Sequence, residues 1–175
     1  MSERTYPDEP VDPFPEPSLT VTDSEGRPIR IEPSGADDAE ALVEMYRTFD
    51  PADRAQGIPP IDEDAIRDWL GTLLSEESIN VVARHDGSVV GHAILVPDRD
   101  EAYELAVFVL SEYQGAGIGT HLLEGLLGRG QHEGVEKVWL TVERWNDPAI
   151  ALYRKLGFEA SNSESFELEM AIRLG

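Results

Sequence analysis

The sequence predicts a single α/β domain of the mixed, α+β kind, in which about four helices flank a central sheet. Three observations lead to this fold class. Short runs of β-branched and apolar residues alternate with longer segments of helical periodicity. Asp86-Gly87 joins two such runs through the two-residue turn that favours a β-hairpin. A glycine-rich turn then joins the apolar run 105–110 to a helical segment.

The N-terminal arm, residues 1–17, differs in composition from the rest of the chain. It carries five prolines among acidic residues and has little apolar surface to bury. We therefore expect a disordered or loosely docked arm, followed by one domain over residues 18–175. The domain opens with alternating residues at 19–22 and 29–31 around a Gly26-containing turn, which indicates a hairpin.

The remaining elements follow from periodicity and from turn residues. Apolar residues recur with helical spacing over 39–49 and 62–74, and the proline- and glycine-containing segment 50–60 separates these helices as a loop. Strands are expected over 79–84, 89–96, 105–110 and 135–142, with the last strands at Phe158 and over 165–173. A helix with four leucines on one face follows the glycines, and another runs from Pro148 to Leu156 and ends at Gly157.

The charge of the chain excludes several classes of partner. Asp and Glu number 35 against 14 Lys and Arg, for a net charge of −21, and a surface of this kind repels nucleic acid and anionic membranes. Only Lys137 and Lys155 are lysines. Acidic, lysine-poor chains are typical of salt-accumulating halophiles, and an acidic protein of an ordinary cytosol is the alternative.

Cysteine content and hydropathy set further bounds. The chain has no cysteine, so disulfides, thiolate nucleophiles and cysteine-ligated metals are excluded. No apolar run approaches the roughly 18 residues of a membrane span, and the acidic N-terminus does not resemble a signal peptide. We expect a cytoplasmic protein with no metal. His121 and His132 could share a helix face, but no acidic residue at ligand spacing joins them, and all four histidines are interpreted as structural or solvated.

The glycine turn carries the first chemical signal. Its sequence is Gln114-Gly115-Ala116-Gly117-Ile118-Gly119-Thr120. Glycines allow a positive φ and a close approach of the backbone to a ligand. The first amides of the following helix have no partner within the helix and lie at its positive end, so the turn is suited to a phosphate or pyrophosphate.

The second signal lies in residues 146–158, where a capped helix carries Tyr153. The two stretches together resemble the GNAT superfamily of N-acetyltransferases. That family has Arg/Gln-x-x-Gly-x-Gly/Ala after its fourth strand and, about 30 residues later, Asn-x-x-Ala-x-x-Leu-Tyr-x-x-x-Gly-Phe. The first pattern matches at Gln114, Gly117 and Gly119. The second matches at Asn146, Ala149, Leu152, Tyr153, Gly157 and Phe158.

The resemblance implies a GNAT fold with splayed fourth and fifth strands, and acetyl-CoA as the co-substrate. Tyr153 is then expected near the sulfur, where a phenol protonates the departing thiolate, and an amide near Val109 is expected to stabilise the oxyanion. Asn146 and the backbone of the fourth strand should hold the pantetheine arm, and the glycine turn the pyrophosphate. The implied binding residues are Val107, Phe108, Val109, Gln114, Gly115, Ala116, Gly117, Ile118, Gly119, Thr120 and Asn146.

The sequence departs from the family pattern at two places. Some members carry a base in the fifth strand where this chain has Thr141, so Glu104 is the candidate that replaces it, with Glu101 or a water chain as alternatives and a solvated strand residue as the structural reading. The first motif position holds neutral Gln114 instead of Arg, and we expect Arg144, Arg154 or Lys155 to meet a phosphate.

The sequence leaves two alternative functions. A dinucleotide-binding Rossmann unit needs Gly-x-Gly-x-x-Gly, whereas here the third glycine comes one residue early. A non-catalytic CoA-binding module on the same fold is the second alternative. The implied partners are acetyl-CoA and an amine acceptor, bound between residues 50–64 and 161–167. Acidic residues in both segments suit a small amine or polyamine, or a protein lysine or N-terminus. A homodimer is compatible with the sequence.

Overall fold

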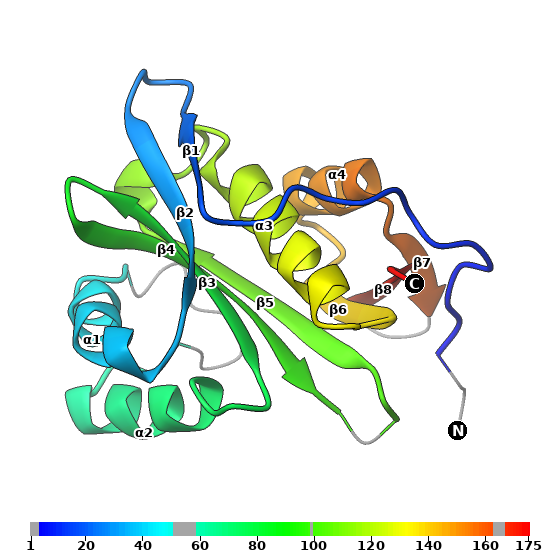
Figure 1. Ribbon diagram of the computed structural model, residues 1–175, viewed down its shortest axis with the longest axis horizontal. Coiled ribbons are helices and arrows are strands. Elements are labelled where there is room, and N and C mark those ends of the chain that lie inside the picture. Colours follow the sequence, from blue (N-terminus) through cyan, green and yellow to red (C-terminus); the bar gives the residue numbers. More distant parts are fainter. Residues whose placement is uncertain (1–3, 51–58, 99, 163–166) are drawn as a thin grey trace.

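A computed structural model describes residues 4–50, 59–98, 100–162 and 167–175. It contains one eight-stranded sheet, in the order β1-β2-β3-β4-β5-β6-β8-β7 (Figure 1). All neighbouring strands are antiparallel except β5 and β6, which are parallel. The predicted mixed sheet flanked by four helices is confirmed.

The strands are β1 (Leu19–Thr22), β2 (Pro28–Ser34), β3 (Ile79–His85), β4 (Ser88–Pro97), β5 (Tyr103–Val109), β6 (Lys137–Glu143), β7 (Glu159–Asn162) and β8 (Glu167–Arg173). The helices are α1 (Ala39–Arg47), α2 (Glu63–Leu73), α3 (Ile118–His132) and α4 (Asp147–Leu156), with short 3₁₀ turns η1 (Ala36–Asp38) and η3 (Ser111–Tyr113).

The helices pack on both faces of the sheet. The leucines of α3 and the buried residues of α4 form the larger core with the sheet, whereas α1 and α2 form a smaller core with Val82 and Val89. Figure 1 shows α1 and α2 side by side, away from α3 and α4. Because α3 has Gly125 where a Cβ would lie 2.9 Å from Ile31 Cγ2, the helix can approach the sheet closely.

The turn residues behave as their chemistry predicts. Asp86 and Gly87 both have positive φ, 51° and 83°, which is the pattern of a type I′ hairpin turn. Asn146 caps α4 and Gly157 ends it with a φ of 114°.

The structure differs from the sequence prediction at β5, which begins at Tyr103 because this residue pairs with Pro97 of β4. Glu104 therefore lies within the strand.

The N-terminal arm lies against the domain over its described residues. It crosses α3 and α4 before β1 (Figure 1). The Val11 amide donates to the Arg173 carbonyl at 2.9 Å, and the Phe14 amide donates to the Gln131 side chain at 2.8 Å. None of the helices in the described residues is long and apolar enough to cross a bilayer.

Candidate active site

The strands β5 and β6 part soon after they meet. Their ladder contains only two pairs, Tyr103 with Val138 and Glu104 with Trp139, although β4 pairs with the whole of β5. The Leu110 amide donates to the Val90 carbonyl of β4 at 3.0 Å. Backbone direction alternates along a strand, so the amides of Val107 and Val109 point away from β4, into the gap.

The gap separates two chemically different faces of β5. Side chains alternate across a strand, and Val107 and Val109 pack against the core of α3 and α4. Phe108 packs against the core of α1 and α2. Glu104 and Phe108 are four residues apart on β5, so their side chains project from the same face of the sheet. The Glu104 carboxylate is therefore on the α1–α2 face. A group held in the gap would therefore lie between these two faces of the sheet.

The glycine turn lies between η3 and α3. Gly115 and Gly117 have φ values of 74° and 89°, which are strained for other residues. Gly117 caps α3 and no side chain caps this helix end. The amides of the first turn, at Ile118, Gly119 and Thr120, are thus the ones that a helix leaves without internal partners.

Gly119 is informative because the fold does not require a glycine there. Its φ is not positive, and a Cβ at this position would meet nothing within 4 Å. An alanine would also be the better helix former. A glycine at this point leaves room for a ligand to approach the backbone, as the pyrophosphate hypothesis requires.

Gln114 and the buried Ala116 hold the turn to its neighbours. The Gln114 side-chain amide donates to the Val109 carbonyl at 2.9 Å, so this residue ties the turn to the end of β5. The Ala116 carbonyl accepts a hydrogen bond of 2.9 Å from the Ser24 amide, in the turn between β1 and β2. The N-terminal hairpin thus supports the turn from the other side.

Arg27 was not identified from the sequence, and it lies beside the glycine turn. Its guanidinium lies 4.3 Å from the centre of the Tyr113 ring and donates to the Glu112 carbonyl at 3.4 Å. The buried Asp23 carboxylate holds it at 2.7 Å. Burial acts to raise the pKa of the Asp23 carboxyl, but the backbone amides of Arg27 and Glu25 and the Arg27 guanidinium together lower it. No local pattern indicates this contact, because 85 residues separate Arg27 from Glu112.

Tyr153 lies in the core formed with α3 and α4. Its side chain is buried, with only 9% exposed, and its ring makes an edge contact with Phe158 at 5.8 Å. Burial raises the pKa of its phenol to about 12, so the hydroxyl is protonated at neutral pH. Asn146, at the start of the same helix, accepts a 3.4 Å hydrogen bond from the Ala149 amide.

Glu104 lies at the last pair of the β5–β6 ladder and is exposed. Partial desolvation and the neighbouring carboxylates of Asp98, Glu167 and Glu169 raise the pKa of its carboxyl, and Arg4 opposes this shift. A raised pKa brings a carboxylate closer to the range in which it acts as a general base.

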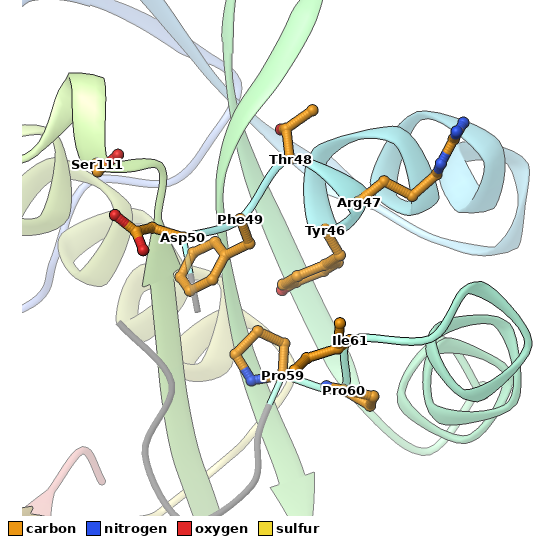
Figure 2. Close-up of a pocket in the computed structure, with 9 residues that line it drawn as sticks. All are labelled: Tyr46, Arg47, Thr48, Phe49, Asp50, Pro59, Pro60, Ile61 and Ser111. Carbon is orange, nitrogen blue, oxygen red and sulfur yellow. The ribbon is translucent and has the colours of Figure 1, made fainter. Parts of the chain in front are cut away.

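A pocket of about 420 Å³ lies at the end of α1. Figure 2 shows the rings of Tyr46 and Phe49 facing Pro59 and Ile61 across it. The pocket is lined by Tyr46, Arg47, Thr48, Phe49, Asp50, Pro59, Pro60, Ile61 and Ser111.

Aromatic packing connects this pocket to β5. The Tyr46 ring makes an edge contact with Phe108 at 5.7 Å, and Phe108 makes another with Trp69 at 5.5 Å. The pocket therefore adjoins the face of β5 that carries Glu104.

Parts of the predicted acceptor site lie outside the described residues, namely 51–58 and 163–166. No contact that the structure gives for Arg144, Arg154 or Lys155 tests their expected role toward a phosphate. In the described ranges, no group of three or more His, Cys, Asp and Glu residues could hold a metal ion.

Comparisons with known proteins agree with this geometry. Residues 39–158 match the acetyltransferase (GNAT) family. An uncharacterized N-acetyltransferase of Mycobacterium tuberculosis is 35% identical over 89 residues, which cover 50% of this chain and 57% of the relative. The ribosomal protein bS18-alanine N-acetyltransferase of Escherichia coli is 37% identical over 83 residues, 47% and 56% of the two chains. The match thus spans little more than half the length of these curated relatives.

Solved structures show the same fold. The GNAT domain of S. lividans PAT has a TM-score of 0.73 at 18% identity, covering 89% of this chain and 96% of that one. A ribosomal-protein-alanine N-acetyltransferase from Brucella melitensis has a TM-score of 0.67 at 27% identity, covering 82% and 99%. A putative acetyltransferase from Salmonella typhimurium, solved with acetyl-CoA, has a TM-score of 0.69 at 21% identity, covering 84% and 94%. The chain belongs to the GNAT acetyltransferase family.

Proposed function

We propose that the protein is an acetyl-CoA-dependent N-acetyltransferase that moves an acetyl group to a primary amine by direct attack. One observation carries the proposal. The β5–β6 ladder ends after two pairs and leaves backbone amides directed into a gap between a face with Glu104 and a face with Tyr153. Direct transfer needs a base and an acid near the reacting carbonyl, and we propose Glu104 and Tyr153 for these roles.

Binding of acetyl-CoA is assigned to the edge of β5 and the glycine turn. The edge over Val107, Phe108 and Val109 would pair with the amides of the pantetheine arm as an added strand does. The pyrophosphate would lie on the amides from Gly115 to Thr120, where the empty space beside Gly119 supports a close approach. Asn146 would contact the pantetheine arm.

The chemical roles follow from the two faces. Glu104 lies three to five residues, about 10 to 16 Å, along β5 from Val107 and Val109, so it takes a proton from the incoming ammonium through a chain of waters. The pKa of that ammonium, near 10.4, keeps it charged at neutral pH. The neutral amine then attacks the thioester carbonyl, and an amide near Val109 stabilises the negative oxygen. When the C–S bond breaks, Tyr153 gives its proton to the thiolate and regains one from solvent.

The pocket beside α1 supports an acceptor with an apolar or aromatic group near its amine. It combines the Tyr46 and Phe49 rings with the carboxylate of Asp50. A small amine or polyamine and a protein lysine or N-terminus all present the required amine. The name of the Escherichia coli relative, which describes action on an alanine of a ribosomal protein, favours including peptide N-termini among the acceptors tested.

Thiol release from acetyl-CoA with a panel of amines and peptides tests the proposal. An active protein accumulates free CoA and acetylated product, which mass spectrometry identifies. A Tyr153→Phe variant should keep CoA affinity and lose turnover by about 10²- to 10⁴-fold. If CoA binds and no amine in the panel is acetylated, the non-catalytic CoA-binding module on this fold becomes the better explanation.

We further propose that the protein works in a cytoplasm of high salt. The support is the net charge of −21 with only two lysines. Salt would screen the repulsion among these carboxylates and between them and the phosphates of CoA.

A further inference from the structure

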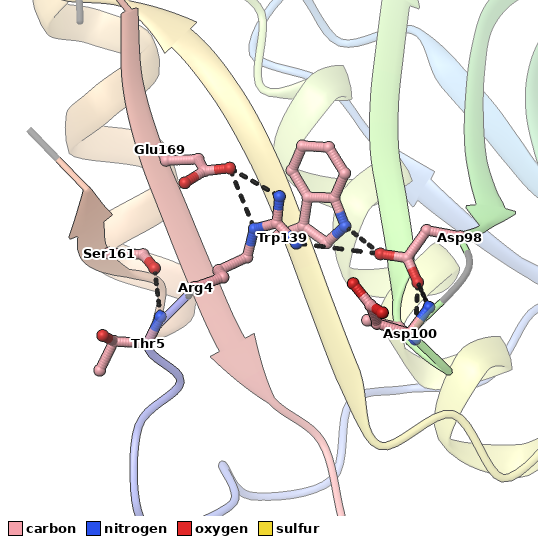
Figure 3. A network of polar contacts seen from close by, with 8 residues as sticks. Arg4, Thr5, Asp98, Asp100, Trp139, Ser161 and Glu169 are labelled. Carbon is pink, nitrogen blue, oxygen red and sulfur yellow. Dashed lines mark hydrogen bonds and ion pairs between the residues drawn. The ribbon is translucent and has the colours of Figure 1, made fainter. Parts of the chain in front are cut away.

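The N-terminal arm places an arginine on the sheet surface beside Glu104. The Arg4 guanidinium lies 3.6 Å from the centre of the Trp139 ring. Its Nε and Nη2 donate to Glu169 Oε1 at 3.0 and 2.7 Å, and its Nη1 lies 3.9 Å from Asp98 Oδ2. Figure 3 shows the guanidinium between Glu169 on one side and Trp139 and Asp98 on the other. We call Trp139, Asp98 and Glu169 the guanidinium seat.

Part of the seat is held in position by bonds that do not involve Arg4. The Trp139 indole donates to Asp98 Oδ2 at 2.8 Å, which fixes the ring and the carboxylate together. Asp98 Oδ1 accepts from the amides of Asp100 and Ala102 at 2.8 and 3.1 Å. The seat is therefore preorganised for a cation, and this lowers the cost of binding one.

The seat lies on the face of the sheet proposed for the acceptor. Trp139 is the direct neighbour of Glu104 across the β5–β6 ladder, and neighbours in a parallel ladder are about 4.8 Å apart. Trp139 alternates with Val138 and Leu140, which belong to the core of α3 and α4, so its ring projects from the opposite face. Glu104 projects from that same face.

The chemistry of the seat suits a guanidinium. An aromatic face attracts a cation, and carboxylates beside it accept the parallel N–H groups of a planar guanidinium better than those of an ammonium. The seat contains two carboxylates for the single Arg4 charge, and Glu104 adds a third close by. The local charge stays negative even when Arg4 is in place.

The arm is anchored away from the seat. The Arg173 side chain donates to the Pro7 carbonyl at 2.7 Å, and the Val11 and Phe14 amides bond to the domain beyond it. On the seat side of Pro7, the Thr5 amide donates to the Ser161 hydroxyl at 2.8 Å. Arg4 keeps 20% of its side chain exposed, so water and a competing cation can reach its ion pairs. The tip of the arm can therefore exchange while the rest stays bound.

We propose that the guanidinium seat is a subsite of the acceptor site, which Arg4 of the same chain fills until an acceptor with a guanidinium beside its amine displaces it. This inference rests on the proposed amine acetylation and narrows the acceptor class to guanidinium-bearing amines, such as an arginine-containing peptide. With the guanidinium on Trp139, the amine of such an acceptor reaches the neighbouring Glu104.

Calorimetric titration in the absence of acetyl-CoA tests the inference. The probe is agmatine, a primary amine joined to a guanidinium by a butyl chain, and the matched control is N-carbamoylputrescine, which keeps the amine and has a neutral urea in place of the guanidinium. Arg4→Ala should bind agmatine several-fold more tightly than the wild type and leave N-carbamoylputrescine binding unchanged. Adding Glu169→Gln to the Arg4→Ala protein should remove the gain.

A second variant vacates the seat without changing it. The Ser161 hydroxyl accepts from the Thr5 amide at 2.8 Å, so Ser161→Ala should loosen the tip that carries Arg4 and tighten agmatine binding in the same direction. Equal agmatine binding in the wild type and both variants, with the fold intact by circular dichroism, overturns the inference. So does tightening that is equal for both probes.

The two proposals can fail separately. Tighter agmatine binding by Arg4→Ala without any acetyl transfer leaves the subsite standing and removes the proposed activity. Acetylation of butylamine together with no effect of Arg4→Ala on agmatine binding leaves the activity and removes the subsite.

Discussion

A buried histidine under the acceptor pocket makes the stability of the fold depend on pH. His92 is fully buried, and its Nε2 lies 2.7 Å from Asn80 Oδ1. The Asn80 amide nitrogen donates to the Leu73 carbonyl at 2.8 Å, so Oδ1 is the acceptor and Nε2 carries the proton. Nδ1 then accepts from the Tyr46 hydroxyl at 2.6 Å. The imidazole is neutral. The hydrogen bond to Nδ1 fixes the ring of Tyr46, which lines the pocket.

Burial lowers the pKa of His92 from 6.5 to about 3. The unfolded chain therefore binds this proton between pH 6.5 and about pH 3, while the folded chain does not. The folded state therefore carries almost no penalty from His92 above pH 6.5, and it loses stability as the pH falls from 6.5 toward about 3. At pH 5 the unfolded state is favoured about thirty-fold by this group, which corresponds to about 2 kcal/mol, whereas the cost at pH 7 is about 0.2 kcal/mol.

Urea unfolding at constant salt, from pH 7 to pH 5, measures this contribution. The comparison is with His92→Gln, which keeps a donor and an acceptor and does not take up a proton. Changes in the carboxylates are common to both proteins, so the wild type should lose about 2 kcal/mol more than the variant. Parallel stability curves for the two proteins, or an NMR titration of His92 with a midpoint near 6.5 in the folded state, would refute the reasoning.

Three further predictions concern the site. Gly119→Ala should raise the free energy of unfolding by about 0.5–1 kcal/mol, because alanine is the better helix former, and should weaken CoA binding measured by calorimetry; unchanged affinity would remove the assigned close approach. Glu104→Gln should lower kcat/KM at pH 7 by about 10²- to 10⁴-fold, with the loss shrinking toward pH 10, where the amine loses its proton unaided; an equal loss at every pH would exclude a role as base. CoA affinity and resistance to urea should both rise from about 0.1 M to about 1 M KCl, as the screening length falls from about 10 Å to about 3 Å; a steady decline of affinity in an intact fold would contradict the proposed adaptation to salt.

Most of the fold was predictable because its signals are local. The two positive φ values at Asp86-Gly87, the cap at Asn146 and the stop at Gly157 are each encoded within a few residues. The glycine turn was located for the same reason, since Gly115 and Gly117 adopt the positive φ that the motif anticipates.

The long-range contacts were not predictable in the same way. Arg27 reaches the glycine turn through a hairpin 85 residues earlier in sequence, and no composition or spacing marks it. The contacts of the arm with the domain, such as Pro15 against Gly128, depend on single close approaches. A proline-rich acidic segment carries no periodic pattern that would indicate them.

The network around His92 illustrates a third limit. The sequence allowed a structural or a solvated histidine, and only the packing of α1 on β4 distinguishes these readings. Tyr46, His92 and Asn80 lie on three different elements, so their hydrogen bonds exist only in the assembled fold.

The central claim is that the open edge of β5 holds acetyl-CoA through its backbone. The most direct measurement is amide hydrogen exchange by NMR, with and without acetyl-CoA, at Val107 and Val109, whose amides point into the gap. We expect both amides to exchange markedly more slowly when acetyl-CoA is bound, together with those of Gly117 to Thr120. Saturating acetyl-CoA that leaves exchange at Val107 and Val109 unchanged would contradict the claim.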